Sequence, residues 1–236
     1  MASNRRMRVA ECGLRIRSLP LVFLSLALFS VVLLIGSESR AEEKPGLAIF
    51  PFYILRVEDP ARGAFCPVCK EVHRSSAIVP DVPKTLTREL YGKMEALGPF
   101  RVLPLDKIEE TLSAGNQKRF EASPASTSVQ LGRELNVDFV MVCILFRFEE
   151  RVGSSLGVEK PASVSFDLHL YRVRDGQKVW DGDFDETQKA LFDNLLQAGS
   201  FFRQGAKWLT AEQLAEGGMD GVLKKLPGAK ELEGKP

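Results

Sequence analysis

The sequence predicts an α/β fold with a mixed parallel and antiparallel sheet of about five strands flanked by helices. In the first half of the chain, short apolar strands alternate with amphipathic helices, a pattern typical of parallel strands joined by helical crossovers. In the second half, two alternating segments meet at Asp175-Gly176, a dipeptide typical of a hairpin turn. The unbroken apolar run at 137–148 suits a central strand that is covered on both faces. The expected order is therefore β-α-β-α-α-β-β-β-α-α.

The first half begins with a predicted buried strand at 46–57, which is rich in β-branched and aromatic residues. The segment 58–80 is predicted to be an irregular insertion. Apolar residues then recur at helical spacing from Leu86 to Leu97, in a helix that Asp81 can cap and Gly98-Pro99 ends. A short strand is expected at 100–103, a short helix at 106–112, a loop at 115–125 and another helix at 126–135.

In the second half, apolar residues alternate with Ser165, Asp167 and His169, which predicts a strand at 164–171 with one solvated face. The return strand of the hairpin is expected at 178–184. The carboxy-terminal segment 186–226 is predicted to be helical, with one helix at about 186–198 and another from a capping box at Thr210–Gln213 to Lys225.

Residues 1–41 are arranged like an export signal. Five arginines between Arg5 and Arg17 precede an apolar run from Leu19 to Gly36, and Ser39-Arg40-Ala41 presents small residues for cleavage before Glu42. The alternative is an uncleaved inner-membrane anchor through residues 19–36, because this run reaches the length of a bilayer span, about 17–25 residues. In both cases we expect residues 42–236 to form one domain in the periplasm, a usual size for a single domain.

The charge of residues 42–236 argues against polyanionic partners. The chain has 32 Lys and Arg and 31 Asp and Glu; residues 1–41 hold six and two of them, which leaves a net charge of −3. A weakly acidic surface gives no electrostatic reason to bind nucleic acid or anionic lipid. Membrane contact is therefore expected only if residues 19–36 stay uncleaved.

The strongest local motif is Cys66-Pro-Val-Cys69, which lies in the insertion and is followed by His73. Haem attachment requires a histidine directly after the second cysteine, where this chain has Lys70. A thioredoxin-like pair would stand at the start of a long helix, which would lower the thiol pKa, and Pro80 follows too soon for such a helix.

Two interpretations of this motif stay open. The first is a zinc site, in which Cys66, Cys69 and His73 supply three suitable ligands and Glu71, water or a partner chain supplies the fourth. The second is a local Cys66–Cys69 disulfide that pins the insertion. In either case Cys143, in the central strand, is expected to be a buried thiol.

The other chemistry-bearing patterns do not predict an enzyme. Ser165, Asp167 and His169 share a strand face, but alternate residues stand about 7 Å apart, and a catalytic triad needs histidine between the other two. The aspartates at 181, 183 and 185 start like a calcium loop without its later glycine and glutamate, and are expected at the surface. Apart from the zinc alternative, no cofactor is expected.

Several segments resemble a group of bacterial envelope domains: Leu47-Ala-Ile-Phe-Pro51-Phe52, Phe100-Arg-Val-Leu103, Leu131-Gly132-Arg-Glu-Leu135-Asn-Val-Asp138 and Gly176-Gln-Lys-Val-Trp180. Together, over roughly residues 46–184, they resemble the TolB amino-terminal-like fold and the similar CsgG and LpoB lipoproteins. Residues 147–208 also resemble uncharacterised envelope proteins and lipoproteins. The resemblance implies a non-catalytic role in binding envelope proteins or in assembling secretion structures. The lipid-attachment cysteine of many members has no counterpart after the apolar run.

Two functional hypotheses follow. The first is a non-enzymatic periplasmic interaction module, an accessory subunit of an envelope assembly or of a secretion or transport complex. Its partner would be another envelope protein or a second copy of the chain, and Phe201, Phe202 and Trp208 would serve the core or a docking patch. The second is a zinc-binding or redox-sensitive envelope protein that acts through Cys66, Cys69 and His73.

Overall fold

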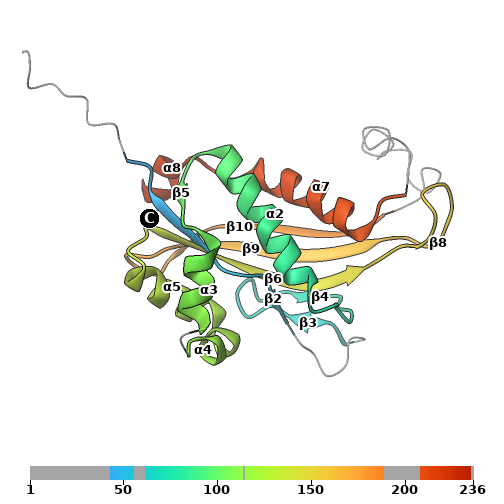
Figure 1. Ribbon diagram of the computed structural model, residues 1–236, viewed down its shortest axis with the longest axis horizontal. Helices are drawn as coiled ribbons and strands as arrows, with labels where there is room; N and C mark the ends of the chain where they lie inside the picture. The colour runs from blue at the N-terminus through green and yellow to red at the C-terminus, as the bar shows by residue number, and fades with distance from the viewer. Residues whose placement is uncertain (1–42, 56–61, 114, 189–207, 235–236) are drawn as a thin grey trace, which may run out of the picture. The chain divides into compact units, whose positions relative to one another are not determined.

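The structure is a computed structural model that describes residues 43–55, 62–113, 115–188 and 208–234 (Figure 1). Lys44–Pro236 form one compact unit. Among the described residues, none of the helices combines the length and the apolar character that crossing a bilayer requires. The expected signal or anchor at 1–41 lies outside the described residues, as do Phe201, Phe202 and most of the helix expected at 186–198.

The unit is built on a six-stranded mixed sheet in the order β10-β9-β6-β1-β5, with β2 paired beside β6. β1 runs parallel to β5 and β6, and β2 is also parallel to β6. β6, β9 and β10 form an antiparallel meander. The predicted α/β class with a mixed sheet is therefore confirmed. The strands are β1 (Gly46–Ile49), β2 (Tyr53–Ile54), β5 (Arg101–Val102), β6 (Phe139–Glu149), β9 (Ser163–Arg172) and β10 (Lys178–Thr187).

The single strand predicted at 46–57 is divided into β1 and β2. The ladder with β6 continues through the Phe50 amide, which donates to the Met141 carbonyl at 3.0 Å. Pro51 comes next and has no amide hydrogen to donate, so regular pairing stops and resumes at Tyr53. The central strand β6 is buried from Phe139 to Arg147, as its apolar run predicted.

One face of the sheet is covered by α2 (Val82–Leu97) and α7 (Ala211–Leu223) (Figure 1). The apolar faces of both helices pack against side chains of the central strands, and together they form one continuous core. The predicted capping box is present, because Thr210 and Gln213 cap each other at the start of α7. A last short helix, α8 (Ala229–Gly234), follows and buries Leu232.

The opposite face is covered by two structures (Figure 1). Helices α3 (Leu105–Ser113), α4 (Gln117–Ala122) and α5 (Pro124–Glu134) pack on one part of it. A small hairpin of β3 (Ala64–Phe65) and β4 (Val72–His73) packs on another part, over Val142, Ile144 and Phe146.

The prediction of a loop at 115–125 is wrong, because this segment contains helix α4. The Phe120 ring stacks on the Phe50 ring of the sheet at 5.6 Å between centroids, so α4 is held by a tertiary contact that its polar sequence does not reveal. The predicted start of a helix at Glu186 is also wrong, because Glu186 and Thr187 end β10.

The hairpin produces a further correction, at the predicted solvated face of β9. Ser165, Asp167 and His169 are 0%, 2% and 1% exposed. The face is polar as predicted, but the segment that was expected to be irregular folds into β3 and β4 and covers it. A second small hairpin pairs β7 (Val152–Gly153) with β8 (Val158–Lys160).

Candidate metal centre

The cysteine motif forms the tight loop of the β3–β4 hairpin. Cys66 follows β3 directly, and its amide donates to the Glu71 carbonyl at 2.8 Å. The Lys70 amide donates back to the Cys66 carbonyl at 3.1 Å, which closes the loop. Lys70 has φ 68°, a left-handed conformation that non-glycine residues rarely adopt. The loop thus turns Cys69 back toward Cys66 and leads into β4, where His73 stands.

Backbone amides of this loop point at the sulfur of Cys66. The amides of Val68 and Cys69 lie 3.4 Å and 3.3 Å from Cys66 Sγ and donate to it. The loop therefore holds the Cys66 sulfur in place with two backbone donors.

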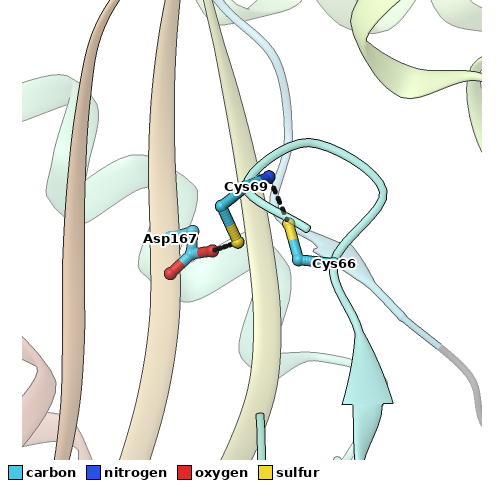
Figure 2. Close-up of side chains that lie close together, drawn as sticks. All are labelled: Cys66, Cys69 and Asp167. Atoms are coloured by element: carbon cyan, nitrogen blue, oxygen red, sulfur yellow. Dashed lines mark hydrogen bonds between the residues drawn. The ribbon is translucent and has the colours of Figure 1, made fainter. Parts of the chain in front are cut away.

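Strand β9 brings two further side chains to the cysteines. The Cys69 thiol donates to Asp167 Oδ2 at 3.2 Å, and Figure 2 shows the Asp167 carboxylate pointing at the Cys69 sulfur. Cys66 Sγ lies 3.7 Å from His169 Nε2. Asp167 Oδ2 and His169 Nε2 are 3.6 Å apart.

His73 completes the cluster from β4. Its ring stacks on Phe146 with 3.9 Å between the centroids and 6° between the planes, which fixes the direction of the imidazole. His73 Nε2 lies 3.5 Å from Cys69 Sγ and 3.5 Å from Asp167 Oδ2. Five potential ligand atoms from two separate segments therefore form one cluster, in which each atom lies within 3.7 Å of at least one other.

The cluster is buried and electrostatically incomplete. Among the described residues, Asp167 Oδ2 lies against the imidazoles of His73 and His169. Burial raises the pKa of Asp167 and of the Cys69 thiol, and burial lowers the pKa of His169 to about 4, so that imidazole is neutral at physiological pH. Within the described part of the chain, Asp167 Oδ1 and His169 Nδ1 have no hydrogen-bond partner. A carboxylate buried in its anionic form is costly unless a cation balances it.

The arrangement can hold a metal ion. Donor atoms of Cys66, Cys69 and Asp167 lie within 4.8 Å of one another, and so do those of Cys69, Glu71 and His73. A tetrahedral zinc with bonds of about 2.0–2.3 Å separates its ligand atoms by about 3.3–3.8 Å, close to the distances within the cluster. Sulfur, imidazole and carboxylate together suit zinc better than calcium or magnesium, which prefer oxygen ligands only.

The structure brings together the three residues that the sequence singled out, Cys66, Cys69 and His73. It adds Asp167 and His169, which sequence reasoning had assigned to a solvated strand face. One signal could have found His169: the chain has only two histidines, and both lie in this cluster.

The other patterns lie elsewhere. Ser165 is buried on the same face of β9, and its hydroxyl has no partner among the described residues. Cys143 is fully buried in the core beneath α2 and α7, as predicted. Trp208 is half-buried near the β7–β8 turn, where its amide donates to the Ser155 carbonyl. The aspartates 181, 183 and 185 are exposed, as expected.

No protein-family model matches this chain, and no curated protein matches its sequence significantly. Several solved structures are similar to it at low sequence identity. The LpoB C-terminal domain from Salmonella enterica is 10% identical with a TM-score of 0.41, over 67% of this chain and 94% of that one. A lipoprotein from Neisseria meningitidis is 14% identical with a TM-score of 0.42, and the match covers 68% of this chain and 98% of that one. PelC from Paraburkholderia phytofirmans, solved as a dodecamer, is 12% identical with a TM-score of 0.44, and the match covers 79% of this chain and 90% of that one. LpoB thus stands among the structural neighbours, as the sequence resemblance predicted.

Proposed function

We propose that this chain is a zinc-binding, non-enzymatic interaction module of the cell envelope. The observation that carries the zinc proposal is the convergence of two thiols and both imidazoles of the chain around one buried carboxylate oxygen. A local disulfide would account for the two cysteines alone. It would leave the buried contacts of Asp167 with His73 and His169 without a role.

A structural role fits the burial of the cluster. Cys66, His73, Asp167 and His169 are all at most 8% exposed, and Cys69 is half-buried. Catalytic zinc sites keep one coordination position open for water and substrate, whereas structural sites are closed by protein ligands. Four buried protein donors around the loop favour a closed site.

The interaction role rests on the sequence rather than on the metal cluster. The basic and apolar order of residues 1–41 supports export, and the sequence motifs resemble envelope domains that bind other envelope proteins. We expect the chain to fractionate with the envelope, and crosslinking there to join it to another envelope protein or to a second copy. Recovery of the chain from the cytoplasm alone would contradict this part of the proposal.

The zinc proposal is tested by metal analysis of the full-length chain purified from the envelope fraction. Wild type is expected to carry one zinc per chain, and the double variant Cys66→Ser/Cys69→Ser none. Cys143→Ala is the matched control, because it removes a buried thiol from the core without touching the cluster. A zinc-free wild type whose mass is lower by two hydrogens would establish the disulfide instead.

A further inference from the structure

We infer that strand β9 completes the metal site through Asp167, so that zinc ties the β3–β4 hairpin to the central sheet. This inference rests on the proposed zinc binding and names the ligand that the cysteine motif lacks. It replaces the sequence-based expectation that Glu71, water or a partner chain would serve, because Asp167 is buried within the cluster whereas Glu71 is exposed at its edge. Cys66, Cys69 and His73 remain the ligands from the hairpin.

The position of one oxygen atom points to Asp167 as the ligand. Oδ2 lies 3.2 Å from Cys69 Sγ and 3.5 Å from His73 Nε2, which are themselves 3.5 Å apart. It also lies within the group of donor atoms that Cys66 and Cys69 form. These separations match the edges of a zinc coordination tetrahedron, about 3.3–3.8 Å.

A supporting role outside the coordination shell fits the contacts of Asp167 less well. A carboxylate that orients a metal-binding histidine accepts a hydrogen bond from the ring nitrogen that faces away from the metal. Asp167 Oδ2 instead faces Nε2 of His73, the same nitrogen that faces Cys69 Sγ. The carboxylate therefore lies on the metal side of the imidazole.

His169 is a neighbour of the shell on the same strand. Its Nε2 faces Cys66 Sγ at 3.7 Å, whereas its Nδ1 has no hydrogen-bond partner among the described residues. A ligating histidine usually donates from its second nitrogen to an outer partner. Because His169 Nδ1 lacks such a partner among the described residues, Asp167 is favoured over His169 as the fourth ligand.

A zinc ion bound by Asp167 would hold the β3–β4 hairpin in place on the sheet. The strands of the hairpin are two residues long, and an isolated two-stranded hairpin is marginally stable in water. A bond from zinc to Asp167 would join the hairpin to β9 across 98 residues of sequence. The metal would thus keep the β3–β4 hairpin packed on the polar face of β9.

The experiment compares Asp167→Asn, His169→Gln and Asp183→Asn in the full-length chain purified from the envelope fraction. Asp183 is the matched control, because it is an exposed carboxylate directly opposite Asp167 in the β9–β10 ladder. Zinc affinity is measured by competition with a chelator, and cobalt is used as a spectroscopic probe of the shell. Asp167→Asn is expected to weaken zinc binding by more than the roughly 10- to 100-fold caused by loss of an outer-shell partner. His169→Gln is expected to weaken it less, and Asp183→Asn, which removes only a nearby exposed charge, least of all.

A second variant keeps the test decisive if Asp167→Asn fails to fold. Asp167→Cys places a thiolate at the same position, and the sulfur-to-cobalt charge-transfer band should then grow from a two-thiolate to a three-thiolate intensity. An unchanged band in Asp167→Cys, unchanged affinity in Asp167→Asn, or a larger loss in His169→Gln would overturn the assignment of Asp167 while zinc binding itself stands. A wild-type chain that binds neither zinc nor cobalt would remove the proposed function as well.

Discussion

Cys66 Sγ and His169 Nε2 lie 3.7 Å apart in the folded chain although 103 residues separate them in sequence. The contact exists because the β3–β4 hairpin packs against the polar face of β9. It links the local cysteine motif to the central sheet, and the two proposals on zinc depend on this linkage.

Chelation should lower the stability of the wild-type domain. Zinc that binds only the folded state stabilises it by about 4 kcal/mol when its free concentration is a thousandfold above Kd. We therefore expect thermal denaturation to move to lower temperature when a strong chelator is added to the wild type or to Cys143→Ala. The Cys66→Ser/Cys69→Ser variant should show no such shift. A chelator-sensitive double variant would place the metal elsewhere.

Hydrogen exchange should locate the effect of the metal. Removal of zinc is expected to speed amide exchange in the hairpin, residues 62–80, and to leave β6 protected, because β6 is held by its neighbours on both sides. Exchange is followed by mass spectrometry with and without the chelator. Faster exchange throughout β6 would show that the metal supports the whole fold rather than its cover.

The left-handed residue of the loop offers a test of backbone strain. Lys70 has φ 68°, which a glycine adopts freely and a β-branched residue adopts only at a cost of about 1–2 kcal/mol. Lys70→Gly and Lys70→Val both remove the hydrogen bond from Lys70 Nζ to the Pro67 carbonyl, so their difference isolates the backbone. Zinc affinity and melting temperature should be lower in Lys70→Val. Equal values in the two variants would contradict this geometry.

Two glycines of α7 should respond oppositely to alanine. A Cβ at Gly218 would stand 2.7 Å from the ring of Phe184 on β10, whereas a Cβ at Gly221 would meet no atom within 4 Å. Gly218→Ala should cost about 1–3 kcal/mol through overpacking. Gly221→Ala should stabilise by up to about 1 kcal/mol, because alanine favours the helix. Denaturant unfolding measures both, and a neutral Gly218→Ala would show that α7 does not pack on β10 this closely.

A buried arginine should hold the carboxy-terminal helix. Arg172 Nη1 donates to the carbonyls of Leu232 and Glu233 in the last turn of α8. Arg172→Met removes these charge-assisted hydrogen bonds and should cost about 2–3 kcal/mol. The control is Arg174→Met, whose side chain is 67% exposed and which also contacts the Glu233 carbonyl. Equal unfolding free energies for the two variants would refute the anchoring role of Arg172.

The sheet could be predicted from the sequence because its signals are local. The apolar run of β6, the alternation in β9 and the turn at Asp175-Gly176 each follow from a few neighbouring residues. Helix α4 could not be predicted, because its stability depends on Phe120 meeting Phe50 across the fold.

Only the residues of the candidate site that lie close together in sequence could be predicted. Cys66, Cys69 and His73 follow one another within eight residues, so their spacing indicates a metal motif. Asp167 and His169 carry no such signal, since alternation with apolar residues is equally typical of a solvated strand face. Only the packing of a segment nearly a hundred residues away makes that face an interior.

X-ray absorption at the zinc edge, on the full-length chain purified from the envelope fraction, tests the central claim most directly. The account predicts one zinc bound by two sulfurs at about 2.3 Å and two nitrogen or oxygen atoms at about 2.0–2.2 Å. The sulfurs should vanish from the spectrum of the Cys66→Ser/Cys69→Ser variant. A shell made only of nitrogen and oxygen in the wild type, or a wild type that retains no zinc, would contradict it.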